Sequence, residues 1–304
     1  MGALPEQIRF GTSSWAYEGW QGLVYRHPYP KSRFAKDSLA EYAAYEYRGA
    51  RLFRTVGLDH TFYRPPTAGQ LAQYAAQLPP GFRVCSKVWE EMTIPVYARH
   101  ARYGAKAGTA NPRFLDAGRF EELVLRPSQE GLGRCLGPFI FEFQRSGLEP
   151  APFLTALDNF LAHLPAGPQY AVEVRNPSVL GARYHDLLKA YGATHVYNHW
   201  NAMPPLGAQH VSLGQSFTAE FVVVRLLTPL GLSYADAVKR YTPYNRLVQP
   251  LPQMRTDTLA LIRQAMSEQR PIYVLVNNRA EGSAPLTIQA LADGLSGPME
   301  TQDC

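Results

Sequence analysis

Several common functional signatures are missing from this sequence. Only three cysteines occur among 304 residues, and Cys85, Cys135 and Cys304 form neither a CxxC pair nor a metal-ligand spacing. We therefore expect reduced thiols in a cytoplasmic setting. No segment approaches the roughly 18 consecutive apolar residues that a membrane helix needs, and the amino-terminal MGALPEQIRFG has no signal-peptide pattern. These absences predict a soluble, unexported protein with no membrane partner.

Nucleotide-binding and nucleophile motifs are absent as well. The turn after the first predicted strand reads GTSSWAYEGW instead of GxGxxG, and neither GxxxxGK[ST] nor GxSxG occurs. An open, doubly wound sheet thus lacks its main sequence signature. A serine triad lacks its elbow motif, and a nucleophile at Cys85 would sit in a packed interior.

Charge is low and only mildly unbalanced. Charged residues make up 18% of the chain, and 30 Lys and Arg against 25 Asp and Glu give a formal net charge of +5. This excess permits an anionic partner but does not by itself indicate nucleic-acid binding. The hydrophobic content of 46% can fill a large core. With no repeat and no low-complexity linker, we expect one domain over residues 1–304, with its core at about 7–295.

Eight short β-rich runs alternate with helical patterns. Leu154, Leu157 and Leu161 recur at helical steps, as do Leu259 and Ile262. Parallel strands need such helical crossovers. The pattern predicts an α/β fold, a single (β/α)8 TIM barrel with long loops after strands 1 and 3. The predicted strands begin near residues 8, 51, 83, 137, 169, 194, 221 and 271.

Side-chain alternation along these strands predicts which charges face the barrel lumen. In the run near residue 169, Val172 and Val174 suit the outer, helix-facing side, which sends Glu173 and Arg175 inward. Each such charge lies toward the carboxyl end of its strand, where active sites of this architecture form. The same rule adds three further charges to the lumen: Lys87, Glu142 and Arg225.

Two interpretations of these five charges stay open. They could pair only with one another and close the barrel. Alternatively, Lys87, Arg175 and Arg225 bind a phosphate or carboxylate while Glu142 or Glu173 moves a proton. Nearby cations lower a glutamate pKa and burial raises it, so the choice of acid is open.

Polar and aromatic residues near other strand ends are further candidates for substrate binding. Trp15, Tyr17 and Trp20 belong to a first loop rich in aromatic and basic residues, and their rings could stack on a base or sugar or simply pack the loop. The other candidates could equally be cap or turn residues; they are Ser13, Asp59, His60, Tyr63, His199, Asn277 and Asn278.

A divalent metal is possible but is not favoured, and no cofactor is expected. No local spacing supports a metal site, and adjacent arginines would compete for the carboxylates. The loop at 95–113 carries a run of cations with no acidic residue among them, which suits either an anion-gathering rim or a solvated loop. The ligands such a metal would use are Asp59, His60, Glu142, Glu173 and His199.

The chain resembles the domain of unknown function family 72, also called YecE-like, over nearly its whole length. The resemblance rests on GTSSW with Tyr17 and Trp20, then DHTFYRPP, GFRVCSK, LGPFIFEFQ, YAVEVRNPS, VVVRL and VNN. It implies a TIM barrel similar in shape to metal-dependent sugar isomerases and abasic-site endonucleases. No established activity comes with it.

Three departures identify the chain as a divergent member. Residues 56–59 read VGLD where the family commonly has Val-Glu-Ile-Asn, so a carboxylate is missing at Gly57. Strand 4 carries Glu142 where the family commonly has Gln, and Leu227-Thr228 replaces His-Gly. The acid could have moved across the lumen, or the chemistry could have changed.

These observations lead to three functional hypotheses. The first is an enzyme of hydrolase or lyase type that acts at the carboxyl end of the barrel on an anionic, phosphorylated or nucleic-acid-derived substrate. The second is a non-catalytic nucleic-acid-binding protein that uses the basic, aromatic loops. The third is a metal-dependent sugar isomerase or hydrolase.

Overall fold

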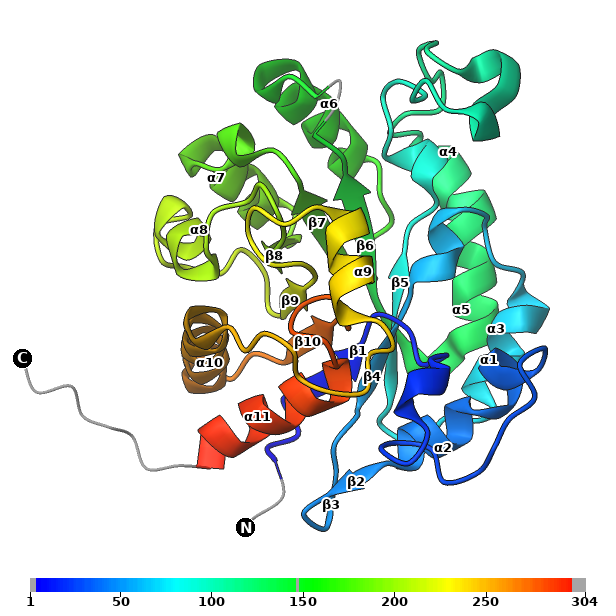
Figure 1. Ribbon diagram of the computed structural model, residues 1–304. Coiled ribbons are helices and arrows are strands. Elements are labelled where there is room, and N and C mark those ends of the chain that lie inside the picture. The colour runs from blue at the N-terminus through cyan, green and yellow to red at the C-terminus, as the bar shows by residue number, and fades with distance from the viewer. Residues whose placement is uncertain (1–3, 146–147, 297–304) are drawn as a thin grey trace, which may run out of the picture.

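The computed structural model describes residues 4–145 and 148–296, which form a closed barrel of eight parallel strands in the order β1-β10-β9-β8-β7-β6-β5-β4 (Figure 1). This confirms the predicted (β/α)8 fold. The strands are β1 Ile8–Thr12, β4 Thr55–Leu58, β5 Arg83–Lys87, β6 Leu136–Phe143, β7 Tyr170–Val174, β8 Thr194–His199, β9 Val222–Leu226 and β10 Ile272–Val276.

Helices surround the barrel and bury the outer faces of its strands (Figure 1). None of the helices in the described residues is long and apolar enough to cross a membrane. The helices are α1 Phe34–Asp37, α2 Leu39–Ala44, α3 Ala68–Ala75, α4 Ala117–Phe120, α5 Arg126–Leu132, α6 Pro150–Ala162, α7 Ala182–Ala190, α8 Leu206–Ser212, α9 Tyr234–Tyr241, α10 Pro252–Ser267 and α11 Ala284–Ser296.

The predicted alternation of side chains is confirmed. The outward residues of β7, Val172 and Val174, join the large cluster between strands and helices, while Ala171 belongs to a separate cluster inside the barrel. That inner cluster, which also contains Cys85 and Tyr273, fills the lumen with apolar side chains. Because the lumen is packed lower down, the charged residues near the carboxyl strand ends form its upper boundary.

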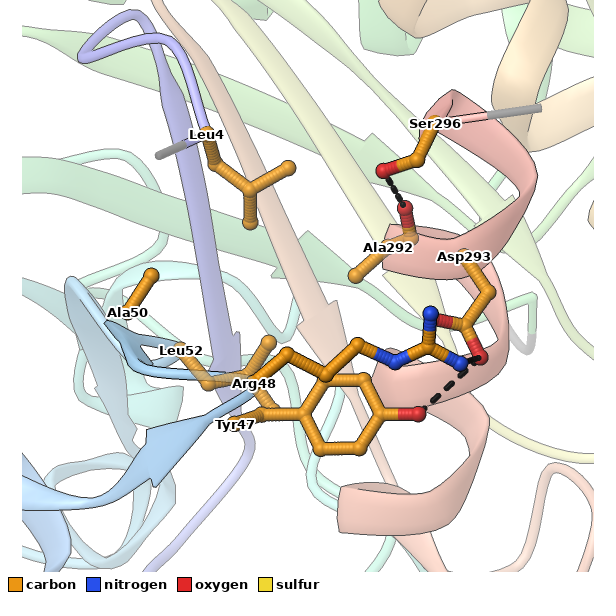
Figure 2. A pocket seen from close by; sticks show the side chains of 8 residues that line it. All are labelled: Leu4, Tyr47, Arg48, Ala50, Leu52, Ala292, Asp293 and Ser296. Atoms are coloured by element: carbon orange, nitrogen blue, oxygen red, sulfur yellow. Dashed lines mark hydrogen bonds and ion pairs between the residues drawn. The ribbon is translucent and has the colours of Figure 1, made fainter. Parts of the chain in front are cut away.

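The second barrel strand begins later than the sequence suggests. The run from residue 51 predicts one strand, but Ala50–Arg51 (β3) pairs antiparallel with Glu46–Tyr47 (β2) and only Thr55–Leu58 enters the barrel. The hairpin lies at the amino-terminal end of the barrel (Figure 1). Figure 2 shows Tyr47 and Arg48 against Asp293 of α11, around a cavity of about 30 Å³ that suits water better than a substrate.

Two long segments extend from the carboxyl ends of strands, as expected after strands 1 and 3. The first runs from β1 to β4 and contains the 3-10 helix η1 (Glu18–Trp20), α1, α2 and the hairpin. The second runs from β5 to α4 and contains η3 (Glu90–Met92) and η4 (Ala101–Lys106). Figure 1 shows this second segment projecting beyond α4, at the carboxyl end of the barrel.

Candidate active site at the carboxyl end of the barrel

Two glutamates lie side by side at the top of the lumen. Glu142 on β6 and Glu173 on β7 are register partners in neighbouring parallel strands, so their side chains share the inner face. Both are buried, at 4% and 0% exposure. Two carboxylates in this position repel one another unless cations lie between them.

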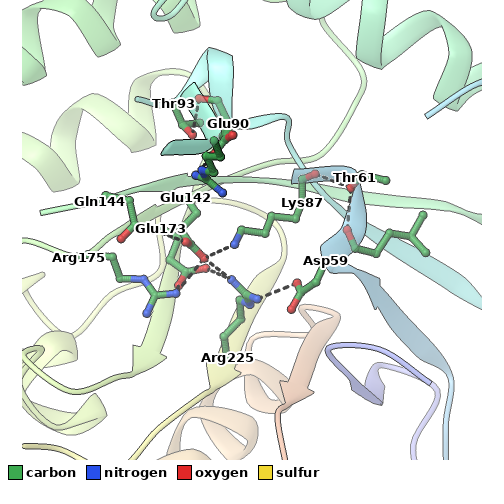
Figure 3. A network of polar contacts seen from close by, with 12 residues as sticks. Asp59, Thr61, Lys87, Glu90, Thr93, Glu142, Gln144, Glu173, Arg175 and Arg225 are labelled. Carbon is green, nitrogen blue, oxygen red and sulfur yellow. Dashed lines mark hydrogen bonds and ion pairs between the residues drawn. The ribbon is translucent and has the colours of Figure 1, made fainter. Parts of the chain in front are cut away.

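Arginines from two strands join these glutamates. Arg175, directly after β7, contacts Glu142 Oε2 through Nη2 at 2.9 Å and also contacts Glu173 Oε1. Arg225 on β9 donates from Nη1 to Glu142 Oε2 at 3.0 Å and to Glu173 Oε2 at 2.5 Å. Each arginine therefore bridges both carboxylates, as Figure 3 shows.

Lys87 completes the surroundings of Glu142. Its Nζ lies 2.9 Å from Glu142 Oε2 and 3.8 Å from the centre of the Phe62 ring. One carboxylate oxygen thus faces three cationic side chains. Although burial alone raises the pKa of Glu142, Lys87, Arg175 and Arg225 together hold it well below its usual range. Glu142 is ionised at neutral pH.

A third carboxylate balances the charge of the network. Arg225 Nη2 donates to Asp59 Oδ1 at 3.0 Å, across 166 residues of sequence. Three anionic side chains, Asp59, Glu142 and Glu173, therefore face three cationic ones, whereas the strand alternation identified only two anions. Because its charges balance, this network has no surplus cation to bind an anion.

An open pocket adjoins the network. Its volume is about 510 Å³, and Gln144 and Phe62 form the wall nearest the ion pairs. Gln144 Nε2 donates to Glu142 Oε1 at 2.5 Å, while Phe62 lies under Lys87. The loop at 95–113 supplies further lining residues, which include Arg99 and Arg102.

Glu90 lines the same pocket and is not among the residues expected from the sequence. Its carboxylate accepts hydrogen bonds from Arg102 Nη2 at 2.5 Å and from the Tyr103 hydroxyl at 3.0 Å. Burial nevertheless raises the pKa of Glu90 against the opposing effects of Tyr103, Arg102 and Lys87. Glu90 therefore binds a proton more readily than an ordinary glutamate, whereas Glu142 releases its proton more readily. Lying just past the end of β5, outside the alternation pattern, Glu90 carried no sequence signal.

The cations of the loop at 95–113 are mostly paired. Glu90 and Glu91, a few residues before the loop, supply the acids that the loop itself lacks. Glu91 contacts Lys106 Nζ at 3.2 Å and Arg113 Nη1 at 2.6 Å. Within the described residues, Arg99 makes no ion pair. Of the arginines and the lysine of this loop, Arg99 therefore keeps its charge unpaired at the pocket, within the described residues.

Most aromatic residues of the first loop pack the fold. Trp15 and Trp20 are exposed by only 2% and 0%, so neither ring offers a face to a ligand. Trp15 donates to the Ala35 carbonyl at 2.8 Å, and Trp20 donates to Asn278 Oδ1 at 3.1 Å. Asn278 also caps the start of α11 by accepting from the Ala284 amide at 2.9 Å. These contacts give Trp15, Trp20 and Asn278 structural roles.

Other expected residues do surround the mouth. Burial raises the pKa of Tyr17 to about 12. The charge of Arg279 lowers this pKa, and the carboxylate of Asp59 raises it. Ser13 is buried with no hydrogen-bond partner for its hydroxyl among the described residues, and Asn277 accepts from the Arg279 amide at 3.0 Å. Tyr63 is 64% exposed.

The two histidines lie apart from the ion-pair network. His60 is exposed and its ring packs edge-on against Tyr74, 5.9 Å away. His199 shares the outward register position of Leu226 and lines a different pocket, with Asp257 and Met254. Among the described residues, no three histidine, cysteine or carboxylate side chains converge as metal ligands would. The five residues considered for a metal therefore do not form one site.

A closed parallel (β/α)8 barrel with a charged network at its carboxyl end places the chain among the TIM-barrel proteins. The chain belongs to the DUF72 family, described as proteins of unknown function, whose model matches residues 9–303. This match confirms the family resemblance that the sequence motifs indicated.

Two crystal structures of DUF72 family proteins show the same fold. One, from Enterococcus faecalis, has a TM-score of 0.66 at 17% identity, with 96% of this chain and 97% of that chain covered. Another, from Thermotoga maritima, has a TM-score of 0.64 at 16% identity, with 95% and 99% covered. No curated protein matches the sequence.

Proposed function

We propose that this DUF72 protein is an enzyme of hydrolase or lyase type that acts at the barrel mouth on an anionic, phosphorylated or nucleic-acid-derived substrate. The observation that carries the proposal is the pair of carboxyl groups with opposite pKa shifts, Glu90 raised and Glu142 lowered, beside one open pocket. Environments that separate two carboxyl pKa values in this way are typical of acid–base sites.

The roles follow from contacts and charge. Arg99 and Arg102 line the pocket, and Arg99 has its charge available for an anionic group. Glu90, whose pKa is raised by burial, is the candidate to donate a proton to a leaving oxygen. Lys87 keeps its charge paired with Glu142 above the Phe62 ring, so Arg99 is the cation that would stabilise negative charge developing in the pocket. An ionised Glu142 that is paired with three cations is a weak proton donor and a weak base. Glu142 and Glu173 therefore hold the cations in place and do not move a proton.

A substrate panel with a matched pair of variants tests this proposal. Phosphate monoesters, phosphate diesters and oligonucleotides with and without an abasic site are assayed from pH 5 to pH 9. We expect Glu90→Gln to lower kcat by about 10²–10⁴-fold and to abolish the fall in rate at high pH that a general acid causes. Glu220→Gln, a change at a glutamate side chain that is 95% exposed, serves as the control.

The outcome is decided by the pH profile as well as the rate. If Glu90→Gln turns over a substrate with the wild-type kcat and the wild-type pH profile, Glu90 is not the acid. If no member of the panel is turned over by the wild-type protein, the proposed substrate class is wrong.

A second candidate function is nucleic-acid binding without catalysis, and one observation favours it. Tyr63 and Tyr234, exposed by 64% and 66%, each carry an arginine on the ring face. Arg102 lies 5.5 Å from the Tyr63 ring centre and Arg279 lies 4.4 Å from that of Tyr234. Such arginine–aromatic pairs can stack on bases and contact phosphates.

Fluorescence anisotropy with a labelled single-stranded oligonucleotide distinguishes this function from the first. Binding that weakens steeply with salt, that falls on Tyr63→Ser and Tyr234→Ser, and that leaves the oligonucleotide uncut would support it. Binding that both variants leave unchanged would exclude these tyrosines as the contact surface.

A further inference from the structure

Four arginines gather at the amino-terminal end of the barrel, opposite the proposed active site. Arg9 lies on β1 and Arg83 begins β5, while Arg51 belongs to the hairpin and Arg54 directly precedes β4. Register pairs connect these strands, since β4 lies between β1 and β5. Segments far apart in sequence thus bring four guanidinium groups to one end of the fold.

Two pockets open between these arginines. The first, of about 230 Å³, is lined by Arg9, Arg51 and Arg54 together with Gly81 and Phe82, and Glu6 is the acidic residue at its edge. The second, of about 400 Å³, is lined by Arg9 and Arg83 with Gln169 and Tyr273. Arg9 borders both pockets, so one extended ligand could reach both.

The arginines bind backbone carbonyls rather than carboxylates. Arg9 Nη1 donates to the Gly81 carbonyl at 2.6 Å, and Arg54 donates to those of Pro5 and Leu4 at 2.6 and 2.8 Å. Arg83 Nη1 donates to the Arg134 carbonyl at 2.7 Å. In the part of the chain that the structure describes, none of the four forms an ion pair.

The positive charge is therefore only partly compensated, by Glu6. Within the described ranges, Arg9 Nε is buried with no acceptor. The pKa of Arg54 is lowered by burial and by the charges of Arg9 and Arg51, with only Glu6 acting against them. Neutral donors could satisfy the same carbonyls without this repulsion, so the positioning of loops does not account for four charges. A bound anion would account for them, because it would offset the repulsion between the arginines.

We propose that the amino-terminal end of the barrel binds a small phosphorylated molecule with two anionic groups, such as a diphosphate. One group would occupy the pocket of Arg9, Arg51 and Arg54, and the other would lie near Arg83. Arginine forks match the oxygens of phosphate. A small molecule is favoured over nucleic acid because the rings that line the pockets, Phe82 and Tyr273, are buried and offer no face for stacking bases.

Inorganic pyrophosphate is the probe and is titrated into the protein in a calorimeter. Chloride keeps the ionic strength constant. We expect saturable binding that is tighter than that of inorganic phosphate. Arg51→Gln should weaken it by about tenfold or more, since a charge-assisted contact to phosphate is lost. Arg51 is exposed and makes no described side-chain hydrogen bond, so this variant should fold normally, which circular dichroism checks. Arg240→Gln, an exposed change on α9, is the matched control.

Three results would overturn the proposal. The first is absence of saturable pyrophosphate binding at millimolar concentration. The second is an affinity that Arg99→Gln lowers but Arg51→Gln does not, which would place the anion at the barrel mouth. The third is a single-stranded oligonucleotide that binds through Arg51 more tightly than pyrophosphate does, which would identify a nucleic-acid surface instead.

Discussion

Replacement of Glu142 by glutamine tests whether the ion-pair network stabilises the barrel. Glu142 Oε2 lies 2.9 Å from Lys87 Nζ, 2.9 Å from Arg175 Nη2 and 3.0 Å from Arg225 Nη1. Glutamine keeps the shape but leaves three cations, of which Arg175 and Arg225 are buried, facing only Glu173 and the partly exposed Asp59. Removal of one partner from a buried network costs about 3–5 kcal/mol, and we expect Glu142→Gln to lower the free energy of unfolding by that amount at pH 7.

The pH dependence of this loss has a definite sign. The folded-state pKa of Glu142 lies well below its ordinary value of 4.5, since its cationic neighbours outweigh its burial. Its contribution to stability is therefore complete above about pH 4.5 and is lost as the pH falls toward the folded-state pKa. The difference in stability between wild type and Glu142→Gln should stay constant from pH 7 to about pH 5 and shrink at lower pH.

Urea unfolding followed by circular dichroism measures both effects. A second variant removes a cation as well: Glu142→Gln combined with Lys87→Met leaves two cations facing two anions. We expect this double variant to be more stable than Glu142→Gln alone by about 2 kcal/mol, since an unpaired charge is removed. If Glu142→Gln lies within about 1 kcal/mol of wild type, or if Lys87→Met lowers its stability further, the charge-balance reasoning is refuted.

Three further expectations concern the barrel itself. Gly57→Ala should lower the free energy of unfolding by about 1–3 kcal/mol, because the added Cβ would lie 3.2 Å from a backbone oxygen. Gly11→Ala should lower it by more, because its Cβ would lie 2.0 Å from a backbone oxygen. Equal losses in urea unfolding would contradict this. Burial lowers the pKa of His199 to about 4, so wild type should lose stability as the pH falls from about 6.5 to about 4. His199→Leu should lose less stability over that range. If the two proteins show the same slope of unfolding free energy against pH, His199 does not cause the loss. Cys85 and Cys135 are buried free thiols, and burial raises the pKa of Cys85 to about 12, so iodoacetamide should label neither until the protein unfolds; mass spectrometry of the native protein checks this.

The barrel and its inward charges could be predicted because they depend on local periodicity. Alternation with a period of two residues placed Glu142, Glu173 and Arg225 on the inner face, and the structure has them there. The same rule holds at two strand ends. Asn278 continues the outward parity of Val276 and contacts Trp20, and His199 shares the outward position of Leu226 and lines a separate pocket. Both residues were candidates only because they are polar and lie at a strand end, which does not say which side they face.

The sequence by itself determined the fold, the strand parity and the family resemblance, since each of these depends on residues close together along the chain. Only the tertiary structure decided how the charges pair. Asp59 reaches Arg225 across 166 residues, Glu90 and Glu91 neutralise the cations of the following loop, and four arginines from separate segments meet at the opposite end. Electrostatic contacts act through space over a few ångströms, so their balance appears only when the barrel has closed.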